Sequence, residues 1–201
     1  MELIQEQPDL AAYLAADDVI DHHHPLVRET ADALRAATAG DARAYAEAAF
    51  AHVRDAVAHS ADSGDPRVPW RASEVLATRN GICYAKSHAL AALLRARGIP
   101  TALCYQRLAD DGAGTRHTVH GLIALRLPGS GRWSRQDPRG NKPGVDARFS
   151  LGEERLAFPV RPALGESDYP RLYAAAHPAA LKALQGSADL RELWRKLPTA
   201  L

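Results

Sequence analysis

The 201-residue sequence has little of several features that mark particular classes of protein. It holds only two cysteines, too few for a disulfide framework. Its 25 basic and 24 acidic residues nearly cancel, so it lacks the basic excess that binding to nucleic acid or to an anionic membrane requires. Its longest helix-like apolar run, residues 89–94, is far too short to cross a bilayer. We therefore expect a globular protein that has neither nucleic acid nor a membrane as a partner.

The start of the chain and its cysteine content bear on the compartment. Residues 1–6 lack the basic segment and the apolar core of a signal peptide. A long chain with few cysteines also suits a reducing environment. Both observations favour a cytoplasmic protein.

A metal site is not indicated by the sequence. The cluster Asp21-His22-His23-His24 lies in a turn, where adjacent side chains rarely aim at one ion, and no second ligand group follows at a recognisable spacing. No acidic pattern of a calcium loop occurs either. We expect no metal and no cofactor.

The hydrophobic pattern changes from helical to strand-like and back. It predicts helices, then a short run of strands, then helices again. This order predicts an α+β fold, in one domain over residues 1–201 with a core at about 41–160 and helical extensions at 1–40 and 161–201. The expected helices are 9–17, 25–38, 41–59, 72–78 and a divided segment from Tyr169 onward, and the expected strands are 101–108, 118–127, 131–137 and 156–160.

The stretch of residues 79–100 is the centre of the predicted fold. Asn80 and Gly81 indicate a loop, and residues 88–94 are apolar almost all the way round, as in a buried helix. Gly98 is typical of a helix end, and we expect Arg95 in the last turn to be solvated. Cys83 would then lie in the first turn of a buried helix, where the reactive thiolate is stabilised. A small buried apolar residue is the alternative role for this cysteine.

A thiolate nucleophile needs a base, and His120 is the best candidate. Its strand has apolar residues on both faces, because side chains alternate, so the strand should be central and covered. His117 lies at the mouth of the strand, on the opposite face. The alternative for His120 is a core histidine that hydrogen-bonds a backbone carbonyl.

Asp137 is the candidate that would orient this base. It ends the next predicted strand, and the turn at 128–130 would bring it back beside the strand of His120. A turn-starting aspartate before proline is the alternative. Asp146 is a competing acid, in a segment whose direction the pattern does not fix.

Together these motifs resemble the transglutaminase-like superfamily. A Gly-x-Cys at 81–83 opens the helix that ends in Leu-Leu-Arg-Ala-Arg-Gly-Ile-Pro at 93–100, and Trp-x-x-x-Asp-Pro follows the strand histidine at 133–138. The resemblance covers residues 72–138. One departure is Leu122, where many members have an aromatic residue.

The resemblance implies a papain-type site in which a helix beginning at Cys83 packs on a small antiparallel sheet. Cys83 would be the nucleophile, His120 the base and later the acid, and Asp137 the residue that orients the imidazole. The implied reaction is hydrolysis or acyl transfer at an amide, in a peptide or a small molecule, through a thioester on Cys83. Trp70 could donate its indole N–H to the oxyanion or shape the substrate groove, with a structural tryptophan as the alternative. Two rival functions are a binding or scaffold domain of the same fold, and an arylamine-type acyltransferase.

Overall fold

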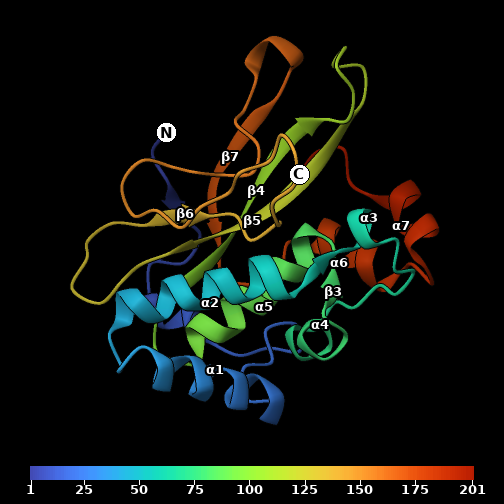
Figure 1. Ribbon diagram of the computed structural model, residues 1–201. Helices are drawn as coiled ribbons and strands as arrows, with labels where there is room; N and C mark the ends of the chain where they lie inside the picture. Colours follow the sequence, from blue (N-terminus) through green and yellow to red (C-terminus); the bar gives the residue numbers. More distant parts are fainter.

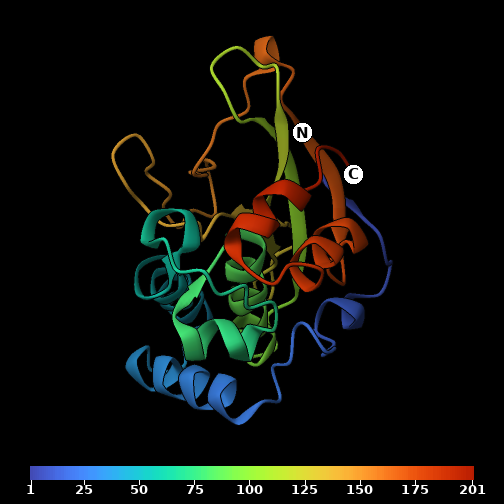
Figure 2. The same cartoon turned by 90° about the vertical axis from the view of Figure 1, so that its right-hand side faces the viewer.

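The computed structural model describes residues 1–201 and is drawn in two views (Figure 1, Figure 2). Its main sheet has five strands in the order β1-β7-β4-β5-β6. Strand β4 is antiparallel to both β5 and β7, β6 is antiparallel to β5, and β1 is parallel to β7. The strands are β1 (Ile4–Gln5), β4 (Thr101–Ala109), β5 (His117–Leu125), β6 (Ser134–Gln136) and β7 (Ser167–Tyr173).

Helix α5 (Cys83–Arg95) lies at the centre of the molecule, where it contacts β4, β5 and three other helices. Figure 1 shows it between those helices and the sheet. Every residue of α5 after Cys83 is buried, in agreement with its apolar circumference. The covering helices are α1 (Pro25–Ala37), α2 (Ala42–Ala56) and α4 (Ala72–Thr78). The remaining elements are η1 (Leu10–Tyr13), β2 (Ala58–His59), α3 (Ser60–Ser63), β3 (Asn80–Gly81), η2 (Pro162–Leu164), α6 (Pro178–Gln185) and α7 (Leu190–Lys196).

The predicted end of α5 is confirmed. Gly98 adopts a positive φ of 70°, and the N–H of Ile99 donates to the carbonyl of Leu94 at 3.1 Å. The prediction for Arg95 is wrong, because its side chain is buried. Its guanidinium donates to three backbone carbonyls, those of Ala15, Thr101 and Ala174. These bonds compensate its burial and join three distant segments.

The strands predicted at 101–108 and 118–127 are confirmed as β4 and β5, and the third is shorter, at Ser134–Gln136. The strand predicted at 156–160 is wrong. There the N–H of Ala157 donates to the side chain of Asp137 at 3.1 Å instead of to a neighbouring strand. The helix predicted at 9–17 is also wrong, since only the short turn η1 forms.

The helix predicted from Tyr169 is wrong at its start, because residues 167–173 form β7. This strand gains its hydrogen bonds from β4, a partner that local composition does not reveal. Pro170 lies where the register between the strands shifts, at an irregularity that tolerates its missing N–H. The C-terminal segment is therefore not only helical, although α6 and α7 follow as expected.

The two faces of β5 are both covered, as the sequence predicts. Val119, Ile123 and Leu125 belong to the large core shared with the helices. Leu122 and Ala124 belong to a smaller core on the other face, completed by Tyr13, Ala102, Cys104 and Leu172. No helix has the length and apolar character needed to span a membrane.

Candidate active site

Cys83 is the first residue of α5 and is partly exposed, whereas the other cysteine, Cys104, is buried in mid-strand. The backbone N–H groups of a first helical turn have no partner within the helix, so the start of a helix carries partial positive charge. The N–H of Gly121 on β5 also donates to the Cys83 sulfur at 3.4 Å. The start of a helix is a common position for a nucleophilic cysteine.

Gly121 allows the first turn of α5 to approach β5 this closely. A Cβ atom at this position would lie 2.5 Å from Cδ1 of Tyr84 and 3.3 Å from its Cα. The Tyr84 hydroxyl donates to the carbonyl of Val119, which fixes the same contact from the helix side. A side chain at 121 would therefore separate Cys83 from the strand that carries His120.

His120 and Asp137 meet where β6 ends beside β5. Ile123 is paired with Gln136, so the next residue, Asp137, lies opposite Leu122 and on the same face as His120. The Nε2 atom of His120 is 2.8 Å from Oδ2 of Asp137. This is the register that the hairpin argument predicts.

The surroundings of Asp137 hold it as a carboxylate. Its side chain is fully buried and accepts hydrogen bonds from the N–H groups of Arg139 and Ala157, both at 3.1 Å. Burial favours the protonated acid, but His120 and these two donors outweigh it and lower the pKa of Asp137. Asp137 can therefore fix the imidazole and stabilise its positive charge.

His120 lies between this carboxylate and the thiol. Burial favours the neutral ring, but the charges of Asp137 and Cys83 outweigh burial and raise the pKa of His120 to about 10. The imidazole is therefore protonated near pH 7, and its charge is balanced within the site. A protonated histidine beside cysteine favours the thiolate.

A cleft of about 680 Å³ opens beside Cys83 and His120. The Phe158 ring lies edge-on to the His120 ring, with centroids 5.2 Å apart. The C-terminal segment forms one wall, since the carbonyl of Pro198 accepts a bond from the N–H of Val119 at 2.9 Å. The apolar lining includes Leu108, Val119, Ala157, Phe158, Trp194 and Leu197.

Trp70 is not brought to this cleft. Its ring stacks against the guanidinium of Arg71 at 4.2 Å and packs on the main core. Its backbone carbonyl is 2.9 Å from Nδ1 of the buried His88. The indole is absent from the cleft lining, so Trp70 is positioned for a structural role.

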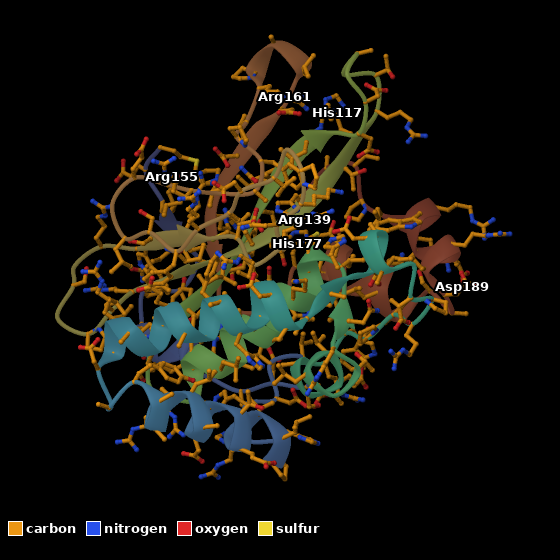
Figure 3. All side chains as sticks on the ribbon, viewed as in Figure 1. His117, Arg139, Arg155, Arg161, His177 and Asp189 are labelled. Atoms are coloured by element: carbon orange, nitrogen blue, oxygen red, sulfur yellow. The ribbon has the colours of Figure 1, made fainter.

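The competing histidine and acid also lie elsewhere. The Nε2 atom of His117 is 2.8 Å from the carbonyl of Leu164. Figure 3 shows His117 near the tip of the β4–β5 hairpin, away from the cleft residue Arg139. Asp146 is exposed and pairs with Arg148 at 2.8 Å. The structure therefore brings together Cys83, His120 and Asp137, and not Trp70, His117 or Asp146.

The residues at 21–24 have roles in the fold. Asp21 accepts bonds from the backbone N–H and the hydroxyl of Ser73. His22 hydrogen-bonds the carbonyl of Leu14, and His24 caps α1. These contacts direct the side chains of Asp21, His22 and His24 to separate partners.

Lys86 is a site neighbour to which sequence reasoning gave no role. It lies one turn beyond Cys83, is fully buried, and donates through Nζ to the carbonyls of Arg54 and Val57. Burial, followed by the charge of Arg139, lowers the pKa of Lys86 to about 8. The signal in the sequence was a lysine one turn after Cys83 in a helix predicted to be buried, because a buried lysine requires partners. Lys86 thus ties the site helix to the end of α2.

Comparison with known proteins identifies the family of this chain. The family model described as the transglutaminase-like superfamily matches residues 28–138, more than half of the chain. No curated protein matches the sequence significantly.

Two solved structures are similar to this chain. A candidate cysteine protease from Cytophaga hutchinsonii is 16% identical, with a TM-score of 0.49, over 66% of this chain and 43% of that one. The periplasmic domain of TgpA from Pseudomonas aeruginosa is 23% identical, with a TM-score of 0.48, over 65% of this chain and 47% of that one. The similarity thus spans less than half of each of these longer proteins. By its family match, this chain belongs to the transglutaminase-like superfamily.

Proposed function

We propose that this protein is a cysteine enzyme that cleaves an amide through a thioester on Cys83. The acyl group then passes to water, which is hydrolysis, or to an acceptor, which is acyl transfer. The observation that carries the proposal is the placement of the His120 imidazole between Cys83 and the buried carboxylate of Asp137. A structural histidine would need only one partner, whereas this one is held between a nucleophile and an acid.

The proposed first half-reaction forms a thioester. The Cys83 thiolate attacks the carbonyl carbon, and the carbonyl electrons move to oxygen as the new C–S bond forms. The protonated His120 then gives its proton to the departing amine as the C–N bond breaks. Asp137 keeps the ring in the orientation that this proton transfer needs.

The second half-reaction restores the enzyme. Neutral His120 takes a proton from water or from an acceptor amine, which attacks the thioester carbon. The C–S bond breaks, and Cys83 leaves as the thiolate beside protonated His120. Water gives hydrolysis and an amine gives acyl transfer.

The cleft supports a peptide or an amide-containing small molecule as the substrate. Its volume of about 680 Å³ lies within the range of ordinary ligand sites. Apolar side chains form much of its wall, and Asp110 and Arg161 provide charges at its lining. An acyl group with an apolar side chain would fit beside Phe158.

Competitive alkylation with iodoacetamide tests the proposal. We expect Cys83 to react much faster than Cys104 at pH 6 to 7, because burial raises the pKa of the Cys104 thiol to about 12. Peptide mapping after short exposures would measure both rates in one sample. A Cys83 rate no greater than that of a free thiol would contradict the proposal and favour a non-catalytic binding domain.

A further inference from the structure

His59 lies beside the nucleophile, although it is far from Cys83 in sequence. It is the last residue of β2 and pairs with Gly81 of β3, two residues before Cys83. Neighbouring strands lie about 5 Å apart. His59 and Cys83 both line the cleft. The β2–β3 ladder therefore places His59 next to the start of α5.

The hydrogen bonding of His59 fixes its tautomer. Its Nδ1 atom accepts a bond from the backbone N–H of Ala61 at 3.2 Å, which caps α3. Since Nδ1 accepts, the proton of the neutral ring is on Nε2. The Nε2 atom has no hydrogen-bond partner within the protein. It is also not fully buried, because the fully buried side-chain atoms without a partner belong to Ser87, Arg97 and Gln106. His59 therefore has an unpaired N–H donor that is accessible to solvent, on a residue that lines the cleft.

The charge state of His59 differs from that of His120. Burial, followed by the positive charges of Arg139 and Lys86, lowers the pKa of His59 to about 3. His59 is therefore neutral across the range in which a cysteine enzyme works. It can donate a hydrogen bond, but it does not compete with His120 for the proton of the thiol.

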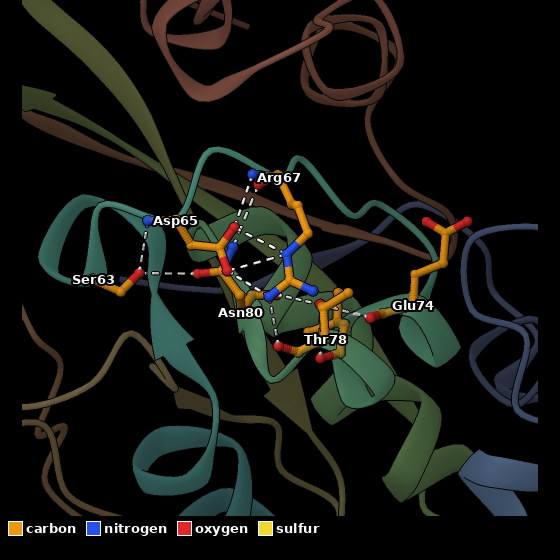
Figure 4. Close-up of polar contacts among 7 residues, drawn as sticks. Ser63, Asp65, Arg67, Glu74, Thr78 and Asn80 are labelled. Carbon is orange, nitrogen blue, oxygen red and sulfur yellow. Dashed lines mark hydrogen bonds and ion pairs between the residues drawn. The ribbon is translucent and has the colours of Figure 1, made fainter.

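A polar network holds the segment that follows His59 against β3 (Figure 4). The buried amide of Asn80 hydrogen-bonds the hydroxyl of Ser63 at 3.1 Å and the carbonyl of Arg67 at 3.3 Å. Arg67 also pairs with Asp65. These contacts fasten the loop after α3 to the residue before Gly81. The segment that follows His59 is thus held in place, and the bond from Ala61 to Nδ1 orients the ring itself.

We infer that the Nε2–H of His59 and the backbone N–H of Cys83 together form the oxyanion hole of this site. This inference rests on the proposed function. Preorganised donors that face the developing oxygen charge account for a large part of catalysis in acyl transfer. Other donors are less suited, because Arg139 is engaged by Asp62 and Trp70 lies outside the cleft lining.

Two reagents that attack Cys83 differently test this role. Iodoacetamide alkylates sulfur by displacement and forms no oxyanion. The activated ester p-nitrophenyl acetate acylates sulfur through a tetrahedral intermediate whose oxygen is negative. A residue of the oxyanion hole should matter for the second reaction and not for the first.

Two variants separate the donor from the helix cap. In His59→Asn the amide oxygen can keep the bond to the N–H of Ala61, but no donor reaches the position of Nε2. In His59→Gln the amide N–H lies near that position, while the cap is lost. His52→Ala is the control, since His52 is a partly buried histidine of α2 outside the cleft lining.

We expect His59→Asn to slow acylation of Cys83 on the order of 10²-fold and to leave alkylation almost unchanged. His59→Gln should recover much of the acylation rate, and His52→Ala should change neither rate. Because His59 stays neutral, the loss in His59→Asn should be the same from pH 5 to pH 8.

Three results would overturn the inference. Unchanged acylation in His59→Asn would show that the ring does not contact the oxyanion. An equal loss in alkylation and acylation would show that His59 only positions Cys83. A wild-type protein that alkylates at Cys83 but is not acylated there would refute the proposed function and this inference with it.

Discussion

The imidazole of His120 is 2.8 Å from the carboxylate of Asp137, and both side chains are almost completely withdrawn from solvent. An ion pair in such surroundings is stable only when its remaining hydrogen-bonding capacity is satisfied. Asp137 meets this condition through two backbone N–H groups, and His120 through the adjacent thiol. The pair thus keeps a positive charge beside Cys83 near neutral pH.

His120, and not His117, should control the reactivity of Cys83. We expect His120→Ala to abolish rapid alkylation of Cys83 at pH 7, because the thiolate loses its paired cation. His117→Ala should leave the rate almost intact, since its ring contacts the carbonyl of Leu164. Alkylation rates from quenched time courses measure both. The reverse pattern would contradict the strand register seen here.

Asp137→Asn should slow alkylation of Cys83 by about 10-fold or more at pH 6 to 7. The amide keeps the shape of the carboxylate but removes the negative charge that helps to raise the pKa of His120. The loss should shrink at high pH, where even a free thiol is ionised. Asp146→Asn is the control and should do little, because that side chain is exposed. A damaging Asp146→Asn with a silent Asp137→Asn would exclude Asp137 from the site.

Gly121→Ala should destabilise the protein by about 1–3 kcal/mol, because the new Cβ atom would overlap the ring of Tyr84. The same displacement of α5 should reduce the alkylation rate of Cys83. Gly112→Ala is the matched control, since a Cβ there has no atom within 4 Å and should change stability by less than about 0.5 kcal/mol. Urea unfolding measures the free energy of unfolding of both variants. Equal stabilities would show that the helix and strand have more space than described.

Acidification should lower the free energy of unfolding through the buried His88. Burial is the main cause that lowers the pKa of His88 to about 4, against an ordinary value of about 6.5. Between these values the unfolded chain binds a proton that the folded chain does not, so stability falls as pH falls. His120 acts in the opposite sense, because the folded chain keeps a proton that the unfolded chain loses as pH rises past about 6.5.

The variant His88→Gln isolates this contribution. From pH 7.5 to pH 5, it should lose about 2 kcal/mol less stability than the wild type. Urea unfolding at the two pH values gives the difference, which is independent of the stability of the variant itself. An equal loss in both proteins would mean that His88 takes up a proton in the folded state.

The central part of the fold could be predicted because its signals are local. Residues close together in the sequence determine the apolar circumference of α5 and its glycine end. They also determine the short turn between β5 and β6. These signals place Cys83 at the start of α5 and Asp137 beside His120. The approach of Cys83 to His120 depends on the packing of α5 on β5, which only the family resemblance implied.

Other features depend on partners far away in sequence. Strand β7 exists because β4 offers it an edge, and Arg95 is buried because three distant carbonyls surround it. His59 approaches Cys83 only through pairing of two-residue strands. Segments this short have no periodicity that a sequence pattern could reveal.

The most direct test of the account is the capture of an acyl group on Cys83. The protein is mixed with p-nitrophenyl acetate, quenched in acid after a short interval, and mapped by mass spectrometry, with Cys83→Ala as the control. We expect an acetyl group on Cys83 that is lost on longer incubation, and almost none on this residue in His120→Ala. Two results would contradict the thioester mechanism. One is a wild-type protein with no acetyl group on Cys83, and the other is acetylation only at other residues, to the same extent in the wild type and in Cys83→Ala.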